Sequence, residues 1–261
     1  MILRRLGNKK KIAKKIQVYF PAHKIYIEPF FGAGGMFFNK PKAIHNIIND
    51  LDSDVFNFYN IVSKNKDDLI EMIKTTPINE DLFKHWVHIK ETEPIKKAFR
   101  YMYITNLSFC GLNNTFSTNP LTFDHDNFNS IINFSYEYLK NTKITNKDFR
   151  KLLTKINFPH GEKDKINTFI YADAPYLKTN DTYSNSFTEK DSIDLFDSLE
   201  KTGCKFAMSE FDNEFVLKEA KKRNLNIIYI GERQNLKNRR TEILITNYKN
   251  NPSLFDGLGC L

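Results

Sequence analysis

The sequence is poor in cysteine, in tryptophan and in long apolar runs. Its 261 residues include 3 cysteines and 1 tryptophan. Cys110, Cys204 and Cys260 are odd in number and lack metal-ligand spacing, which argues against a disulfide framework and favours a reducing, intracellular location. No run approaches the length of a membrane span, and the basic N-terminus lacks the apolar centre of a secretory signal. We therefore expect a soluble, cytoplasmic protein without membrane contact.

Acidic residues are fewer than basic ones. The chain has 39 Lys and Arg against 31 Asp and Glu, a formal charge of +8. This excess favours a polyanionic partner, and nucleic acid is the leading candidate. Lys and Asn are abundant throughout the chain, however, so charge alone is a weak indicator. The length fits one large α/β domain or a domain with a sizeable insertion.

Apolar periodicity indicates an α/β protein with an insertion. A β-prone run at 24–27 leads into a glycine-rich turn and an apolar stretch, which predicts a strand, a loop and a helix. A second apolar run, 43–49, ends at Asp50, which a parallel sheet would present at the carboxyl end of a strand, where ligands bind. From about Phe56 to Asn146 the spacing becomes helical. The last two predicted strands close the sheet antiparallel.

The glycine-rich turn, Phe31 to Gly35, predicts a nucleoside-binding loop. Glycine lacks a Cβ and adopts positive φ, so a ligand can approach the backbone, although a tight strand-to-helix turn has the same composition. The loop lacks the Lys-Ser/Thr ending of a P-loop and the spacing of dinucleotide binders. Asp50 follows at the distance of an acid that accepts hydrogen bonds from ribose hydroxyls. An ordinary cap or turn role is the alternative for Asp50, and Asp52 and Asp54 are better cap candidates.

The tetrapeptide Asp173-Ala174-Pro175-Tyr176 ends another apolar strand and combines a carboxylate, a carbonyl and an aromatic ring. The N6 lone pair of adenine is delocalised into the ring, so methylation there requires acceptors for both N–H bonds. Asp173 and the carbonyl of residue 174 would supply them. Tyr176 would stack on a flipped base. Taken alone, the tetrapeptide favours the alternative, a turn with proline that ends the strand.

These segments together resemble the Dam-like, alpha-group DNA adenine-N6 methyltransferases, and the resemblance covers nearly the whole chain. The tetrapeptide lies where the family has Asp-Pro-Pro-Tyr. The other matching elements are Leu6 to Lys9 for the N-terminal Gly-Gly-Lys element, Glu28 to Gly34 for the cofactor loop, Asn49-Asp50 for the ribose-binding element, Asp148-Phe149 for the pair that holds the cofactor's adenine, and Arg233, Arg239, Glu242 and Asn247 for the C-terminal signature.

The resemblance implies a Rossmann-like, S-adenosylmethionine-dependent α/β methyltransferase fold with a mixed seven-stranded sheet. Residues 1–55 and 147–261 would form the catalytic domain, and 56–146 an inserted helical target-recognition domain. The implied reaction transfers a methyl group from S-adenosylmethionine to N6 of a flipped adenine in duplex DNA, without a metal, in a restriction-modification or Dam-like system. The protein would be a monomer or weak dimer, and a companion restriction endonuclease would fit such a system.

The resemblance also assigns the site residues. The catalytic group would consist of Asp173, Ala174, Pro175, Tyr176 and Lys9, with Lys9 keeping Asp173 ionised. The cofactor would contact Gly7, Lys9, Glu28, Pro29, Phe30, Gly32, Gly34, Asp50, Asp148, Phe149 and Asp173. DNA would contact Lys84, Lys96, Lys97, Arg100, Asn113, Asn114 and Thr115, for which solvated helix faces are the alternative.

Several positions depart from the family pattern. They are Ala174 for the first proline, Asn8 for a glycine, Asn113 or Asn114 for a common arginine, and Glu210 for a common asparagine. The carbonyl of Ala174 survives, and Pro175 still disfavours the α region at residue 174, so we expect an active, slower enzyme. The alternatives are a non-catalytic DNA-binding relative, an RNA adenine-N6 methyltransferase and a small-molecule methyltransferase.

Overall fold

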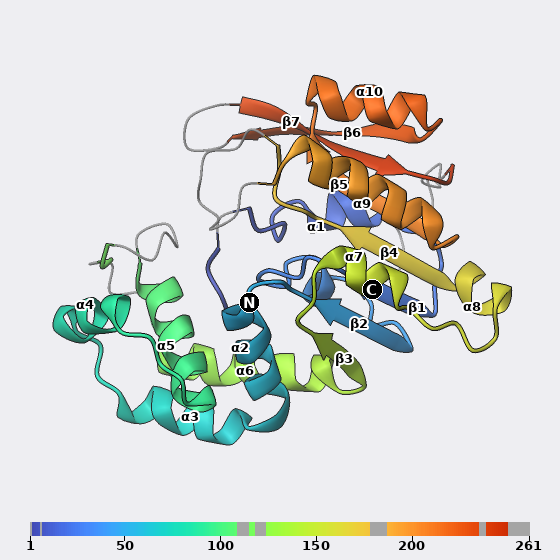
Figure 1. Ribbon diagram of the computed structural model, residues 1–261. Helices are drawn as coiled ribbons and strands as arrows, with labels where there is room; N and C mark the ends of the chain where they lie inside the picture. The colour runs from blue at the N-terminus through green and yellow to red at the C-terminus, as the bar shows by residue number, and fades with distance from the viewer. Residues whose placement is uncertain are drawn as a thin grey trace, which may run out of the picture. The chain divides into compact units, whose positions relative to one another are not determined.

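A computed structural model of the chain describes residues 2–5, 7–108, 115–117, 124–177, 187–234 and 239–249 (Figure 1). Its strands are β1 (Ile25–Glu28), β2 (His45–Asn49), β3 (Thr142–Thr145), β4 (Thr168–Ala172), β5 (Lys205–Phe211), β6 (Asn226–Gln234) and β7 (Arg239–Thr246). They form one seven-stranded sheet in the order β3-β2-β1-β4-β5-β7-β6. β1, β2, β4 and β5 pair in parallel, whereas β7 pairs antiparallel with β5 and β6. The predicted mixed sheet with an antiparallel end is confirmed.

The chain divides into two compact units. The helical unit comprises residues 1–10, 31–39 and 50–146, and the sheet unit comprises 11–30, 40–49 and 147–261. The helical unit contains the 3-10 helix η1 (Phe37–Asn39) and helices α2 (Ser53–Lys64), α3 (Lys66–Thr75), α4 (Glu80–His88), α5 (Pro94–Leu107) and α6 (His125–Leu139). The sheet unit contains α1 (Ala13–Gln17), α7 (Phe149–Thr154), α8 (Glu162–Ile166), α9 (Glu189–Lys201) and α10 (Glu214–Lys222). No helix in the described part of the chain is long and apolar enough to cross a membrane.

Side-chain caps begin α2, α4, α5 and α6 of the helical unit. Asp52, one of the two predicted caps, accepts a hydrogen bond from the backbone of Asp54 and starts α2. Asn79, Glu93 and Asp124 cap α4, α5 and α6 in the same way. Such a cap satisfies a backbone N–H that the first helical turn leaves without a partner. The predicted helical character of this part of the sequence is therefore confirmed.

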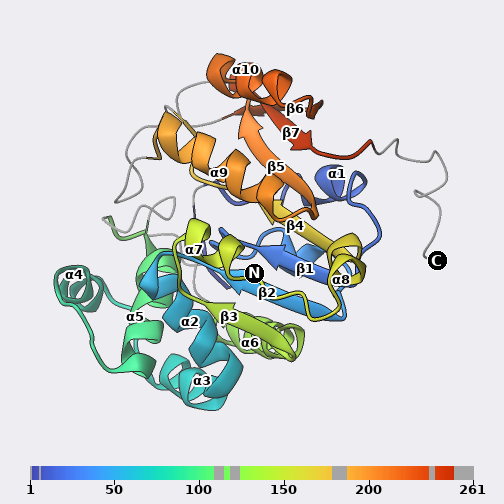
Figure 2. The same ribbon diagram turned by 45° about the vertical axis from the view of Figure 1, so that its right-hand side comes forward.

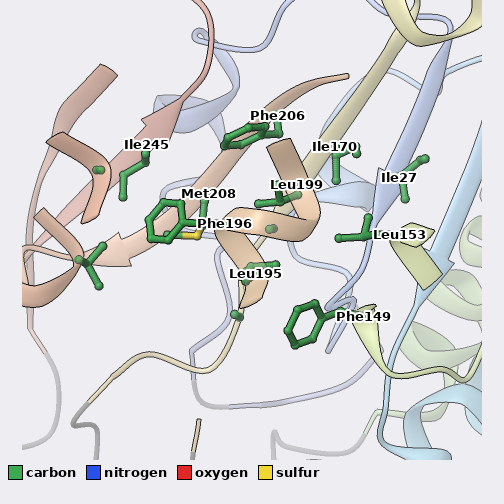
Figure 3. Packing of buried hydrophobic residues seen from close by; sticks show 14 of the residues in the cluster. Ile27, Phe149, Leu153, Ile170, Leu195, Phe196, Leu199, Phe206, Met208 and Ile245 are labelled. Atoms are coloured by element: carbon green, nitrogen blue, oxygen red, sulfur yellow. The ribbon is translucent and has the colours of Figure 1, made fainter. Parts of the chain in front are cut away.

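Apolar side chains of the sheet unit pack between α9 and the strands (Figure 3). All five residues of β4 are buried, as expected for a central parallel strand. Leu195, Phe196 and Leu199 form the buried stripe of α9 beneath which β4 and β5 lie. Figure 2 shows α10 beside the antiparallel strands β6 and β7. This core fixes the carboxyl ends of β1, β4 and β5, from which the candidate site is built.

One predicted element is wrong. The apolar stretch after the glycine-rich turn forms only the three-residue η1, not the expected helix. Gly34 holds φ at +70°, and Pro41 disfavours helical backbone at Lys40, so these two residues limit any helix to the short segment between them. β1 begins at Ile25, one residue after the predicted start, and β2 begins at His45, two residues after it. The carboxylate of Asp50 still follows the carboxyl end of β2 directly, as predicted.

Candidate active site

The glycine loop of the helical unit is shaped by two glycines with positive φ. Gly32 has a φ of +53° and Gly34 a φ of +70°, which L side chains rarely adopt. A Cβ on Gly34 would lie 2.5 Å from the ring of Phe38, whereas a Cβ on Gly32 would meet nothing within 4 Å. Gly34 is therefore required by packing and by φ. Gly32 leaves open space at the backbone, which suits a ligand that approaches closely.

Asp50 holds the glycine loop from the side. Its Oδ2 accepts a hydrogen bond from the backbone N–H of Gly32 at 2.7 Å, and its Oδ1 accepts one from Asp52 at 2.9 Å. Burial raises the pKa of Asp50, while Arg5 and the two backbone donors oppose that rise. A carboxylate oxygen has two lone-pair sites, so each oxygen retains capacity to accept from a ligand hydroxyl. The carboxylate and the loop predicted to bind the cofactor thus contact each other directly.

Gly7 and Lys9 lie in the N-terminal segment of the helical unit. Lys9 is 3% exposed, and its Nζ donates to the carbonyl of Gly7 at 3.5 Å. Asn8, which replaces a family glycine, accepts a hydrogen bond from the backbone of Lys10. A Cβ on Gly35 would lie 2.1 Å from Asn8 Oδ1, so this segment packs tightly against the glycine loop. Burial of a lysine sets Lys9 apart from the exposed lysines that follow it.

In the sheet unit, Asn49 joins two of the predicted cofactor segments. Its amide donates to the carbonyls of Pro29 and Lys147 at 2.9 and 2.8 Å, and its Oδ1 accepts from the backbone of Lys147 at 3.0 Å. Buried side-chain amides that satisfy backbone groups in this way hold loops in one arrangement. Glu28, at the end of β1, is 2% exposed and accepts a hydrogen bond from Tyr26. The Pro29-Phe30 and Asp148-Phe149 pairs are therefore tied to each other.

Three phenylalanines form an aromatic cluster beside these segments. The ring centroids of Phe30 and Phe149 are 5.3 Å apart, and each lies 6.2 Å from that of Phe187. These distances are typical of stabilising aromatic pairs. Figure 3 shows Phe149 at the margin of the apolar core, near Leu195 and Leu153. Phe30 and Phe149 were predicted from the sequence, whereas Phe187 was not, because no motif marks it.

The tetrapeptide follows β4 and is held by two buried carboxylates. The Tyr176 hydroxyl donates to Glu242 Oε1 at 2.5 Å, and its ring packs edge-on against Phe211 at 4.7 Å between centroids. The backbone N–H of Leu177 donates to Glu210 Oε2 at 3.3 Å. Burial, followed by the negative charges of Asp173 and Glu242, raises the pKa of Tyr176 well above its ordinary value. Tyr176 thus stays a neutral hydrogen-bond donor.

Asp173 and Ala174 differ in exposure. Asp173 is half-buried, directly beyond the end of β4, whereas Ala174 is 6% exposed and belongs to the apolar core. A proline at 174, the family residue, would carry more apolar surface than Ala174 does. The carboxylate of Asp173 is therefore accessible, whereas the side chain of Ala174 is packed in the core.

The predicted DNA-binding lysines and arginine lie on α4 and α5. Lys84 is exposed and pairs with Glu80 at 2.8 Å, and Lys97 pairs with Asp54 at 3.0 Å. Arg100 Nε donates to the carbonyl of Trp86 at 2.7 Å, so it also links α4 to α5. Lys96 is exposed on α5. Of the remaining predicted contacts, Thr115 is exposed, and Asn113 and Asn114 lie outside the described residues.

Comparison with known proteins assigns the family. The profile of the D12 class N6 adenine-specific DNA methyltransferases matches residues 6–241, from the N-terminal element to β7. The chain belongs to this family. It is therefore an adenine-specific DNA methyltransferase that uses a methyl donor and acts on DNA, and the predicted resemblance and reaction class are confirmed.

Relatives with assigned names agree with the family. The type II methyltransferase M1.LlaDCHI of Lactococcus lactis subsp. cremoris is 25% identical over 278 residues, which cover 94% of either chain. The modification methylase StsI of Streptococcus sanguinis is 25% identical over 94% of this chain and 42% of its own. The DNA adenine methylase of Serratia marcescens is 31% identical over 112 residues, 41% of either chain. Both restriction-modification enzymes and DNA adenine methylases are thus similar to this D12 methyltransferase.

Proposed function

We propose that this D12 methyltransferase transfers the methyl group of S-adenosylmethionine to N6 of an adenine flipped out of duplex DNA. The observation that carries the proposal is the tetrapeptide after β4, with a half-buried carboxylate at Asp173 and a tyrosine fixed by Glu242. A flipped base needs an aromatic face for stacking and acceptors for its Watson–Crick edge. Tyr176 would supply the face, and Asp173 with the carbonyl of Ala174 would supply the acceptors.

The residues present fit S-adenosylmethionine. The open backbone at Gly32 and the carboxylate of Asp50 suit a ribose, and the cluster of Phe30, Phe149 and Phe187 suits an adenine ring. When bound, the cofactor supplies an electrophilic methyl group on a sulfonium. Asp148 and Glu28 are proposed as further contacts, and the role predicted for Lys9 stays a prediction.

The chemical step proposed for this site is a direct displacement. Asp173 and the carbonyl of residue 174 accept hydrogen bonds from the two N6 protons, which raises electron density on N6 as it attacks. The bound cofactor would supply the methyl group and would leave as the thioether, while Asp173 would take the surplus N6 proton and pass it to water. Positioning by the tetrapeptide converts two bound reactants into an aligned pair. Alanine at position 174 keeps the backbone carbonyl that would accept the hydrogen bond, and it lacks the restricted backbone of proline.

Residues 56–146 are proposed to form the target-recognition domain. Lys84, Lys96, Lys97, Arg100 and Thr115, with Asn113 and Asn114, are the proposed DNA contacts, because they lie in that segment and offer cationic or hydrogen-bonding groups. The names of relatives support a restriction-modification or Dam-like system, in which a companion endonuclease is proposed. We also propose a monomer or weak dimer. A DNA substrate supports the predicted cytoplasmic location.

The proposal is tested by supplying methyl-labelled S-adenosylmethionine with unmethylated duplex DNA, single-stranded DNA or RNA, and digesting the product to nucleosides. We expect label in N6-methyladenine from duplex DNA at a rate well above that for RNA. Preferential labelling of RNA would replace the proposal with an RNA methyltransferase. DNA binding without label in any base would identify a non-catalytic relative and implicate Ala174.

A further inference from the structure

Arg150 lies at the start of α7 and contacts both members of the predicted adenine-binding pair. Its Nη1 donates to Asp148 Oδ2 at 3.1 Å, and its guanidinium lies 4.4 Å from the centroid of the Phe149 ring. The backbone N–H of Arg150 donates to the other oxygen, Asp148 Oδ1, at 2.9 Å. One residue therefore fixes both oxygens of Asp148, and each oxygen keeps a lone pair for a ligand.

The same guanidinium reaches the first two turns of α9. Arg150 Nε donates to Asp194 Oδ2 at 2.8 Å, and Nη2 contacts Asp191 Oδ1. Asp191 is also held by the capping box that starts α9, in which it accepts from the backbone of Thr188 at 2.9 Å. Thr188 follows Phe187 directly in the chain. Arg150 is thus connected by side-chain contacts to Asp148 and Phe149, and through Asp191 to the residue next to Phe187.

We propose that Arg150 is a positioning residue for the adenine of the cofactor. This assignment deepens the proposed function and rests on it. Arg150 fixes the Asp148 carboxylate, which would accept from the amino group of adenine, and anchors α7, which carries Phe149, to α9. A planar guanidinium with several fixed donors is suited to this task, whereas lysine is a point charge on a flexible stem. Arg150 belongs to none of the sequence elements that resemble the family.

The alternative is that Arg150 only stabilises the fold, and the chain contains a matched control for it. Arg223 also contacts three carboxylates, Asp197 at 2.6 Å, Glu200 at 2.5 Å and Glu219 at 3.4 Å, two of them on α9. Its guanidinium lies 5.3 Å from the centroid of Phe196, as Arg150 lies over Phe149. Arg223 joins α9 to α10 and contacts none of the residues predicted to bind the cofactor. The two arginines therefore share chemistry and a common helix, but not the site.

The experiment measures binding of S-adenosylhomocysteine by calorimetry, and thermal unfolding, for wild type, Arg150→Met, Arg150→Lys and Arg223→Met. We expect Arg150→Met to raise the Kd by about tenfold, equivalent to losing one charge-assisted hydrogen bond, and Arg223→Met to change it by less than about twofold. Both substitutions should lower the Tm by similar amounts. Arg150→Lys should fold as wild type does, yet raise the Kd by about threefold to tenfold. Lysine lacks the planar set of N–H donors with which the guanidinium contacts several carboxylates at once.

A second readout separates positioning from a general effect on the enzyme. The KM for the cofactor should rise in Arg150→Lys while the KM for duplex DNA stays unchanged, and the ratio of Kd values should be the same for 5′-methylthioadenosine as for S-adenosylhomocysteine, because both carry the adenine. Unchanged affinity in the Arg150 variants, or an equal loss of affinity in Arg223→Met, would overturn the role of Arg150 and leave the proposed cofactor in place. Failure of the wild-type protein to bind either ligand would overturn the proposed cofactor and the assignment together.

Discussion

The two loops that carry the candidate chemistry are built in different ways. The glycine loop after β1 takes its shape from its own backbone, with positive φ at Gly32 and Gly34. The tetrapeptide loop after β4 has no glycine, and distant residues hold it: Glu242 on β7 binds Tyr176, and Glu210 on β5 binds Leu177. Local sequence sets the backbone conformation of the first loop, and one side chain outside the loop, Asp50, then holds it through Gly32. The second depends on the sheet being formed, because its partners are more than 30 residues away in the chain.

This difference predicts opposite responses to substitution. In the glycine loop, one added methyl group should lower the free energy of unfolding wherever positive φ or close packing leaves no room for a side chain. In the tetrapeptide loop, a change at Ala174, which offers only its backbone carbonyl, should be mild, whereas changes at the remote carboxylates that hold the loop should be costly.

Gly34→Ala should have the largest effect. Positive φ costs an L residue about 1–2 kcal/mol, and overpacking against Phe38 at 2.5 Å adds about 1–3 kcal/mol. Denaturant unfolding should therefore show a loss of several kcal/mol, with weakened cofactor binding. Gly32→Ala is the control, because its Cβ meets nothing in the protein and only the cost of φ remains. Equal stability losses in the two variants would contradict the packing account of Gly34.

Glu242→Leu should rank next. The substitution removes the acceptor that Glu242 gives the Tyr176 hydroxyl, and a buried group that loses its acceptor costs about 1–3 kcal/mol. We expect the kcat to fall by about tenfold or more, with DNA binding largely kept. Glu242→Gln retains an acceptor oxygen and should recover most of the rate. A Glu242→Leu enzyme with wild-type kcat would show that fixing Tyr176 is unimportant.

Cofactor affinity should depend on the protonation of Asp50. Burial raises the pKa of Asp50, so its carboxylate becomes protonated at a higher pH than an exposed aspartate does. The ionised form is the better acceptor for ribose hydroxyls, so affinity should be full well above the raised pKa and fall as the pH decreases through it. Calorimetry across this acidic range should show the fall in wild type and a weaker, pH-independent affinity in Asp50→Asn. The same pH dependence in both proteins would assign the titration elsewhere.

Ala174→Pro should have the smallest effect. Restricting the unfolded chain stabilises a protein by about 0.4–1 kcal/mol when the native backbone accepts proline. Because Glu210 and Glu242 already hold the loop, we expect a change in kcat of less than about fivefold. A proline that switched on an otherwise inactive enzyme would show that Ala174 disables the native protein.

The same contrast explains what the sequence revealed. The glycine loop, the acid after β2 and the tetrapeptide after β4 were predicted, because each is a local pattern at the end of an apolar run. The helix after the glycine loop was predicted wrongly, since apolar composition outweighed Gly34 and Pro41 in that prediction. Phe187 and the contact between Tyr176 and Glu242 could not be predicted from spacing, because tertiary packing alone brings those residues together. Arg150 follows Phe149 directly in the chain, but its contacts with Asp191 and Asp194 on α9 are also tertiary and could not be predicted.

The most direct test compares the wild-type enzyme with Asp173→Ala, using labelled S-adenosylmethionine and unmethylated duplex DNA, with nucleoside analysis of the product. We expect N6-methyladenine from wild type and a loss of at least about a hundredfold in Asp173→Ala, the scale of removing a transition-state acceptor, while the variant remains folded and still binds DNA. N6-methyladenine formed at the wild-type rate by a folded Asp173→Ala protein would contradict the assignment of the tetrapeptide as the catalytic centre.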